Sequence, residues 1–250
     1  MKMDMSEQEK KTFIRKKGLY EVVVKRLLDI LCALLVLFLF GWLYLILALL
    51  VRIKIGRPVF FLQPRSGMIT PGTGKECIFD IIKYRTMSYE QDEEGRLLPD
   101  HKRLIRFGEM LRRTSLDEIP EVINILRGDM SFVGPRPFLV RDMVFMTEEQ
   151  RRRHTARPGL TGLAQVMGRN SISWEEKMEW DLKYIEKVSF LSDFRILLKT
   201  VAILFKRGEN FGGTDLADDY GDALLKEGKV TREQYDLLQE SARRMVEDRS

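Results

Sequence analysis

Cysteine and histidine are both scarce in this chain, with two of each among 250 residues. Two cysteines cannot supply the disulfide framework of a small secreted domain, and Cys32 lies inside an apolar run where pairing with Cys77 is not expected. A reducing compartment is therefore expected. His101 and His154 stand alone in the sequence, so a site built on histidine or cysteine ligands is not predicted.

Several motifs that mark common catalytic sites are also missing. The chain has no Walker phosphate loop, Rossmann glycine fingerprint, HExxH, paired CxxC or GxSxG. Any metal would therefore be a hard cation held by carboxylate and phosphate oxygens, which favours Mg²⁺. Aromatic residues interleaved with cations are sparse, which argues against a surface for single-stranded nucleic acid.

Charge is unevenly distributed along the chain. Residues 209–250 carry 6 Lys and Arg against 11 Asp and Glu, whereas residues 1–208 carry 36 against 26. The basic charge of residues 1–208 is typical of a protein that binds a nucleic acid, an anionic membrane surface or a phosphorylated substrate.

One long uncharged segment favours the last two partners. Residues 30–51 are 22 apolar residues without a charge, which exceeds the roughly 18 needed for a membrane helix. The run starts too late and is too long for a cleaved signal peptide. It is interpreted as a permanent membrane helix.

The topology of this helix has two alternatives, a plain span and a re-entrant helix. Lysines and arginines flank the run on both sides, and the positive-inside rule assigns such flanks to the cytoplasm. A helix that enters, bends and returns to the same face satisfies both flanks, and Gly41 lies at its middle. We therefore expect re-entry.

The remaining patterns predict an α-rich α+β fold. Residues 58–63 and 76–84 read as two strands of a small β-hairpin, and residues 102–113, 173–187 and 190–205 have helical apolar spacing. The last helix suits either a membrane interface or a buried core. The expected domains are a polar tail over 1–18, the membrane helix over 19–57, a catalytic domain over 58–208 and an acidic helical tail over 209–250.

Two adjacent acids, Asp117 and Glu118, precede an apolar pattern that ends at Gly128. The plain interpretation is a capping box, in which Ser115 caps a helix starting at Leu116 and Glu118 bonds back. A functional interpretation comes from the neighbouring Gly-Pro-Arg-Pro sequence, which holds Arg136 on a stiff backbone. An acid near a rigidly mounted arginine suits phosphate chemistry.

Taken together, six segments resemble the bacterial polyprenyl-phosphate phosphoglycosyl transferases of the small monotopic type. The resemblance covers about residues 20–208, in the order KRLLD (25–29), PVFFLQPRSG (58–67), FDIIKYRTM (79–87), SLDEIPEVINILRGDMSFVGPRP (115–137), RHTARPGLTGLAQVMGRNSISW (153–174) and DLKYIEKVSFLSDFRILLKT (181–200). Two positions depart from it. The apolar run has no Ser-Pro break, and the family's TGWAQV reads TGLAQV with Leu163.

The resemblance implies an enzyme of glycan assembly that acts in two covalent steps. An aspartate attacks the β-phosphate of a UDP-sugar and releases UMP, and undecaprenyl phosphate then accepts the phospho-sugar. Carried over by motif, the catalytic pair is Asp117 and Glu118, with Asp117 also binding Mg²⁺. The substrate-binding positions are Lys83, Arg112, Arg136, Arg169 and Asp181.

The implied location is the bacterial inner membrane, with the catalytic part on its cytoplasmic face. The implied partners are the two substrates and membrane lipids but no nucleic acid, and a homodimer is left open. A second interpretation also remains, a non-catalytic scaffold anchored by the apolar run that binds anionic lipid or an assembly partner. Such a scaffold needs the basic charge but not Asp117.

Overall fold

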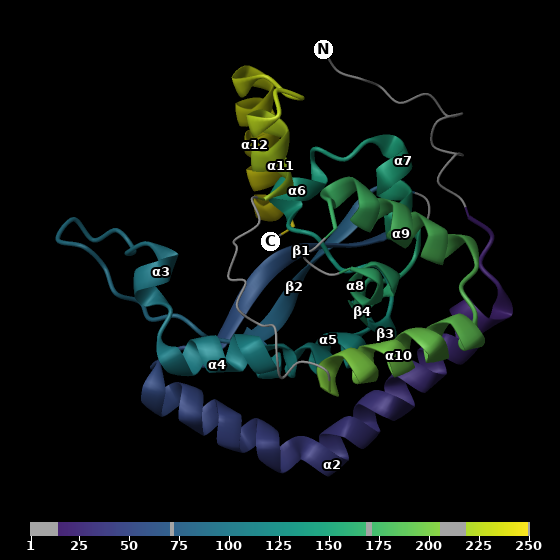
Figure 1. The fold of residues 1–250 in the computed structure, drawn as a ribbon, viewed down its shortest axis with the longest axis horizontal. Coiled ribbons are helices and arrows are strands. Elements are labelled where there is room, and N and C mark those ends of the chain that lie inside the picture. The colour runs from purple at the N-terminus through teal and green to yellow at the C-terminus, as the bar shows by residue number, and fades with distance from the viewer. Residues whose placement is uncertain (1–14, 71–72, 169–171, 206–218, 250) are drawn as a thin grey trace. The chain divides into compact units, whose positions relative to one another are not determined.

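The structure is a computed structural model that describes residues 15–70, 73–168, 172–205 and 219–249 (Figure 1). The chain forms two compact units, which are described separately. The first contains the described residues of 1–28, 64–79 and 129–250, and the second contains residues 29–63 and 80–128.

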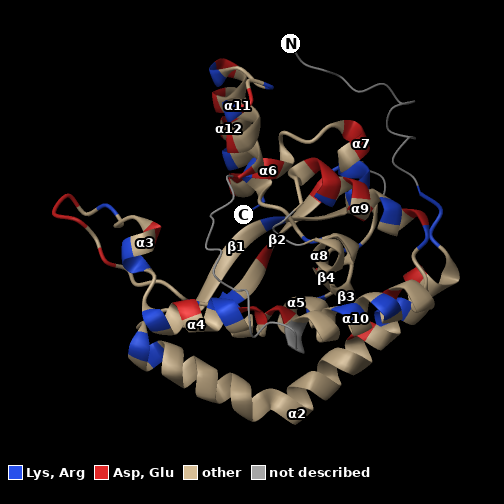
Figure 2. Cartoon of the chain, viewed as in Figure 1, with Lys and Arg blue, Asp and Glu red and all other residues tan. Residues whose placement is uncertain are grey.

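A continuous helical stretch over residues 20–54 contains most of the predicted membrane segment. It starts as the π-helical turn η1 (Tyr20–Val24) and continues as α2 (Lys25–Lys54). Among the described residues it is the one helix that is long and apolar enough to cross a membrane, judged by length and composition. Figure 2 shows α2 free of charge over most of its length. Its large apolar side chains, including Phe38 and Leu45, are largely exposed, as expected of a helix surrounded by lipid.

Helix α2 is bent near its middle (Figure 1). The bend has no proline to explain it. The indole Nε1 of Trp42 donates a hydrogen bond to the carbonyl oxygen of Leu39 at 3.0 Å, beside Gly41. A side chain that binds a backbone carbonyl weakens the helical ladder at that turn, and glycine adds flexibility there. Re-entry of the helix stays a prediction.

The predicted hairpin is confirmed, with the second strand as expected and the first extending further than residue 63. Strand β1 (Phe60–Ile69) pairs antiparallel with β2 (Glu76–Tyr84). Each strand runs from one unit to the other, since the unit boundaries fall at residues 63–64 and 79–80.

The second unit continues through three short helices and one helical turn. These are α3 (Asp100–Arg103), α4 (Arg106–Thr114), the 3₁₀ turn η2 (Leu116–Glu118) and α5 (Glu121–Arg127). Leu47, Val51, Tyr84 and Leu111 form its buried core. The helix predicted over 102–113 is confirmed as α4 from Arg106 onward, but it does not start at residue 102, because Leu104 takes an extended conformation and forms a β-bridge with Met87.

The first unit is built around two short parallel strands that the sequence did not predict. Strand β3 (Ser131–Val133) pairs with β4 (Gly159–Thr161), with Ser131 opposite Gly159 and Val133 opposite Thr161. The surrounding helices are α6 (Val140–Met143), α7 (Glu148–Arg151), η3 (Arg152–Thr155), α8 (Leu163–Met167), α9 (Trp174–Glu186) and α10 (Phe190–Phe205).

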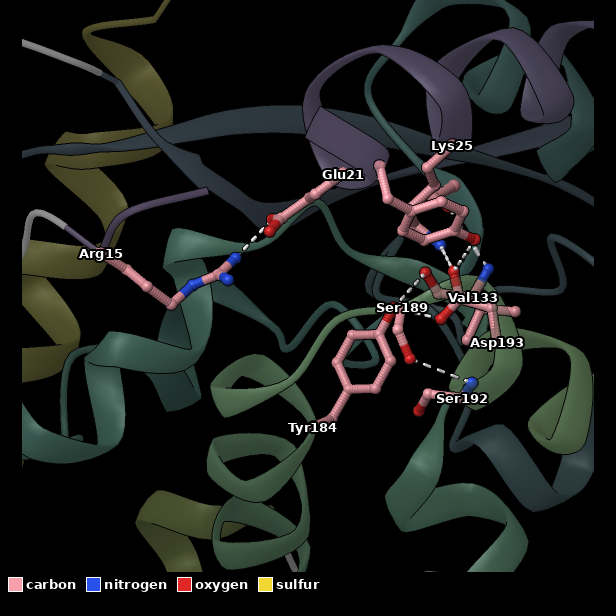
Figure 3. Close-up of polar contacts among 10 residues, drawn as sticks. Arg15, Glu21, Lys25, Val133, Tyr184, Ser189, Ser192 and Asp193 are labelled. Atoms are coloured by element: carbon pink, nitrogen blue, oxygen red, sulfur yellow. Dashed lines mark hydrogen bonds and ion pairs between the residues drawn. The ribbon is translucent and has the colours of Figure 1, made fainter. Parts of the chain in front are cut away.

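A buried carboxylate ties the start of α2 to α10. Asp193 accepts hydrogen bonds from the Lys25 ammonium, the Tyr20 hydroxyl (2.8 Å) and the Tyr184 hydroxyl (2.8 Å). Figure 3 shows Lys25 and Tyr184 converging on Asp193. The large apolar side chains of Phe190, Leu191, Phe194 and Leu198 on α10 are exposed, so the interfacial alternative suits this helix better than a buried core.

The acidic tail contributes two helices to the first unit. Helices α11 (Tyr220–Lys226) and α12 (Arg232–Glu247) match the expected helical tail, and the Thr231 side chain caps α12. Tyr220, Leu224 and Ala242 are buried in one apolar core with Phe138 and Met178. The described part of the tail is therefore packed into the apolar core of the first unit. Residues 209–218 and 1–14 of the two predicted tails lie outside the described residues.

Candidate active site

The predicted capping box at Ser115 is wrong. Ser115 has a left-handed backbone (φ 55°, ψ 22°), and its side chain makes no capping bond. Its N–H instead closes the end of α4 on the carbonyl oxygen of Arg112 at 3.1 Å. A residue that ends one helix in this conformation cannot also take the extended conformation of an N-cap.

Asp117 and Glu118 lie in the separate 3₁₀ turn η2, and the α-helix begins only at Glu121 after Pro120. Asp117 is 8% exposed and Glu118 is half-buried. With capping removed as an explanation, the two acids are better explained by a function than by helix start signals.

Lys83 of β2 lies against this acidic turn. Its Nζ is 2.8 Å from Oε1 of Glu118 and 3.3 Å from Oε1 of Glu121. Glu121 is 0% exposed, so its carboxyl contacts the ammonium out of reach of water. Glu121 was not among the site residues predicted from the sequence. Its spacing of three residues from Glu118 places both acids on one side of the turn, which was an available signal.

Asn124 fixes the helix that carries Glu121 to the strand that carries Lys83. Its buried amide accepts a hydrogen bond from the N–H of Ile82 (3.0 Å) and donates one to the carbonyl oxygen of Asp80 (2.7 Å). Two bonds to one strand set the register of α5 along β2. Lys83 therefore meets Glu118 and Glu121 on a rigid framework.

Arg112 belongs to the same unit, at the end of α4. Its Nε donates to Oγ1 of Thr86 at 2.9 Å. Gly108 allows this approach, because a Cβ there would lie 1.8 Å from the carbonyl oxygen of Thr86. Arg112 is thus anchored beside the end of β2, and its contact with phosphate stays a prediction.

The carboxylates of η2 suit Mg²⁺ by chemistry, since hard oxygen donors are what this ion prefers. No group of three or more His, Cys, Asp or Glu side chains in the described ranges is arranged to hold a metal. The residues therefore fit an ion that Asp117 and Glu118 share with substrate phosphates and water, which is the usual manner of Mg²⁺. They do not fit a site made of protein ligands alone.

In the first unit, the loop around Arg136 is as rigid as the sequence predicts. Fixed donors bind four successive carbonyl oxygens: those of Pro135 (N–H of Gly159, 2.9 Å), Arg136 (Nη2 of Arg153, 2.6 Å), Pro137 (Nη1 of Arg65, 3.2 Å) and Phe138 (N–H of Ser66, 2.9 Å). Neither proline has an N–H to satisfy. The half-buried Arg136 is therefore mounted on a backbone with little freedom.

Close backbone packing at Gly134 explains why glycine recurs here. A Cβ on Gly134 would lie 2.3 Å from the carbonyl oxygen of Arg157, and one on Gly162 would lie 2.1 Å from that of Gly134. The N–H of Gly134 also donates to Thr161 of β4 at 2.9 Å. Any side chain at these glycines displaces the segment that carries Arg136.

The last two predicted substrate residues have different outcomes. Asp181 of α9 is 1% exposed, and its Oδ2 accepts hydrogen bonds from Arg153 (2.5 and 3.0 Å). Arg169 lies outside the described residues. Lys83, Arg112, Asp117 and Glu118 thus belong to the second unit, whereas Arg136 and Asp181 belong to the first.

Comparisons with known proteins agree on one family. The bacterial sugar transferase family matches residues 20–207. "Uncharacterized sugar transferase EpsL" of Bacillus subtilis is 46% identical over 180 residues, covering 72% of this chain and 86% of the relative. "Exopolysaccharide production protein ExoY" of Sinorhizobium fredii is 34% identical, covering 74% and 88%. A Caulobacter vibrioides protein named "UDP-glucose:undecaprenyl-phosphate glucose-1-phosphate transferase" is 38% identical, covering 72% and 69%.

The family match spans both compact units and includes every predicted site residue. It ends before α11 and α12. This chain therefore belongs to the bacterial sugar transferase family.

Proposed function

We propose that this protein transfers a sugar 1-phosphate from a UDP-sugar to undecaprenyl phosphate. The family membership and the names of relatives support the reaction class. The observation that carries the proposal is the 3₁₀ turn with Asp117 and Glu118, which does not serve as a helix cap and lies beside Lys83. A cation among carboxylates on a fixed framework suits the handling of a diphosphate.

In the first step, an Oδ of Asp117 attacks the β-phosphorus of the donor. The new bond joins Asp117 to the phospho-sugar, and the bond between the β-phosphorus and the bridging oxygen breaks. UMP leaves with that electron pair. A carboxylate is ionised at neutral pH and needs no base to activate it as a nucleophile. Lys83 offsets the negative charge of the phosphates. Arg136 is assigned to a substrate phosphate by the family resemblance.

In the second step, a phosphate oxygen of undecaprenyl phosphate attacks the same phosphorus. The bond to Asp117 breaks, and the carboxylate is restored. The product is a sugar joined to the lipid by a diphosphate. Both steps exchange one oxygen substituent on phosphorus for another, so no oxidant or reductant is needed.

Asp117 and Glu118 would hold Mg²⁺, which supplies charge neutralisation between the anionic nucleophile and the diphosphate. Glu118 contacts Lys83 in the structure, whereas the buried Glu121 gives Lys83 a second contact. Lys83 can therefore stay in place when Glu118 turns toward a bound cation.

The names of relatives suggest which donors to test first. Two relatives are named for UDP-glucose, and a relative from Erwinia amylovora is named "UDP-galactose-lipid carrier transferase". UDP-glucose and UDP-galactose are therefore our first candidates. The apolar helix α2 supports placing the reaction at a membrane, and we assign it to the cytoplasmic face of the inner membrane because both flanks are basic.

The test is UMP release by the full-length protein in detergent, with undecaprenyl phosphate, Mg²⁺ and a panel of UDP-sugars. We expect release with at least one donor and none from Asp117→Asn. Asp100→Asn is the matched control, because Asp100 is exposed and pairs with Arg103 on the neighbouring turn of α3. Turnover retained by Asp117→Asn contradicts the covalent mechanism. A folded protein that is inactive with every donor favours the scaffold interpretation.

A further inference from the structure

A completely buried arginine holds the backbone of the Arg136 loop. Arg153 is 0% exposed, and its guanidinium uses three of its nitrogens as donors. Nε and Nη2 bind Oδ2 of Asp181, Nη2 also binds the carbonyl oxygen of Arg136 at 2.6 Å, and Nη1 lies 3.3 Å from Nε2 of His154. The guanidinium carbon lies 4.0 Å from the ring centre of Phe138. Arg153 therefore contacts the chain on both sides of Pro137.

His154 gives the Arg153 guanidinium a further contact, at Nη1. Burial lowers the pKa of His154 to about 4, so the imidazole is neutral at physiological pH. A neutral ring with its proton on Nδ1 donates to Oε1 of Glu76 (3.2 Å) and leaves Nε2 to accept from Arg153. Glu76 is held in turn by Arg151, whose Nε lies 2.6 Å from Oε1.

A buried ion pair is a costly way to fill a core, since apolar residues of the same volume stabilise a fold equally well or better. What an apolar pair cannot do is bind a carbonyl oxygen in a set direction. The carbonyl oxygen of Arg136 is the group that the pair reaches, and prolines 135 and 137 lack the N–H groups that could otherwise fix this segment.

We propose that Asp181 and Arg153 are positioning residues, through which the loop is held so that Arg136 meets the phosphate of the substrate. The proposal deepens the proposed function and rests on it. It gives Asp181 a role that differs from the substrate contact implied by the family resemblance. Asp181 acts on the reaction through Arg153 and Arg136, because its carboxyl is 1% exposed and faces the guanidinium.

The first test measures the loop without relying on activity. Hydrogen exchange is followed by mass spectrometry in the full-length protein in detergent, for wild type, Asp181→Asn and Arg152→Gln. We expect faster exchange over residues 131–139 in Asp181→Asn, because the donor to the Arg136 carbonyl is no longer held. Arg152→Gln is the matched control, since Arg152 pairs with Glu149 at the surface and takes no part in the contacts described around Arg153. Unchanged exchange in Asp181→Asn overturns the proposal.

The second test is a double-mutant cycle on UMP release. We expect Asp181→Asn to lower kcat by roughly 10- to 100-fold with a smaller change in KM, as for a misplaced catalytic group. The same substitution made in an Arg136→Ala background should cost less than about 2-fold, because the group it positions is already gone. An equal loss in both backgrounds, or a loss that only follows the unfolded fraction, means that the pair is structural and overturns the proposal.

Arg153→Lys covers the case in which Asp181→Asn does not fold. It keeps a positive partner for Asp181 but removes the planar fork that reaches both Asp181 and the Arg136 carbonyl. The same exchange and kinetic changes are expected, and wild-type behaviour of this variant contradicts the proposal. A wild type without UMP release refutes the proposed function, whereas an active wild type with additive losses refutes only the positioning role.

Discussion

The ammonium of Lys83 lies 2.8 Å from Oε1 of Glu118, the residue that directly follows the proposed nucleophile Asp117. This contact joins the end of β2 to the 3₁₀ turn η2, and Asn124 fixes the same strand to α5 through its amide. The acidic pair is therefore oriented by a fixed cation from another part of the chain, and each partner can be tested by substitution.

Removing Lys83 alone should destabilise the fold. Lys83→Met leaves the completely buried Glu121 without its cation, and breaking a buried pair from one side costs about 3 kcal/mol or more. In the double variant Lys83→Met, Glu121→Gln we expect most of this loss to be regained, with activity still absent. Denaturant unfolding and UMP release measure the two effects. Equal destabilisation of the single and double variants contradicts the assigned pair.

The stability of the fold should fall as the pH drops from about 6.5 to about 4. Burial lowers the pKa of His154 to about 4 in the folded protein, so the unfolded chain takes up the proton first in this range. The stabilisation that the neutral His154 contributes is complete above the pKa of this histidine in the unfolded chain. It is lost as the pH falls toward the lower pKa that His154 has in the folded protein. Unfolding free energies across this range should show the slope, and His154→Gln should flatten it.

Asp142 should have the opposite effect near the docked tail. Burial, followed by repulsion from Asp219, raises the pKa of Asp142 to about 6, although the N–H of Gly221 and the charges of Arg141 and Arg65 act against this. The folded state therefore keeps the proton of Asp142 to a higher pH than the unfolded chain does. The stabilisation from this proton is complete below about pH 4 and is lost as the pH rises through about 6.

The test of this tail contact is Asp142→Asn at pH 7 to 8. Asparagine keeps an oxygen that can accept from the N–H of Gly221 and removes the charge facing Asp219. We expect a higher melting temperature than wild type at pH 7 to 8, and a smaller difference at pH 5. A variant that is less stable than wild type at pH 7 to 8 rules out the charged carboxyl as a source of strain here.

The sequence was sufficient for local features. The hairpin and the end of α5 at Gly128 each depend on residues within a few positions of one another. Asp117 and Glu118 were found from a motif, and Arg136 from its flanking prolines. Structural features and candidate site residues that depend on a short stretch of sequence could therefore be predicted.

The rest depends on distant partners. Strands β3 and β4 are three residues each and pair across a separation of 28 residues, so no periodicity reveals them. Glu121 and Asn124 make their contacts with Lys83 and Ile82 only when β2 packs beside α5, so their roles cannot be predicted from the local sequence. The capping box at Ser115 failed for a similar reason, because α4 uses the same residue as its left-handed end.

Re-entry of α2 is tested by cysteine labelling in intact cells. Cys32 and Cys77 are both exposed, so they are first replaced by serine. Single cysteines are then placed at Lys2, before the helix, and at Glu93, after it. A re-entrant helix leaves both sites unlabelled by an impermeant reagent until the cells are opened. Labelling at Lys2 from outside means that the helix spans the membrane.

The most direct test of the central claim is an acceptor-free reaction of the full-length protein with its UDP-sugar and Mg²⁺. Without undecaprenyl phosphate, the account predicts a burst of one UMP per active protein molecule. It also predicts an adduct with the mass of one phospho-sugar, located on Asp117 by peptide mass spectrometry and removed when undecaprenyl phosphate is added. UMP release that requires the acceptor, with no adduct on Asp117, would contradict the covalent mechanism.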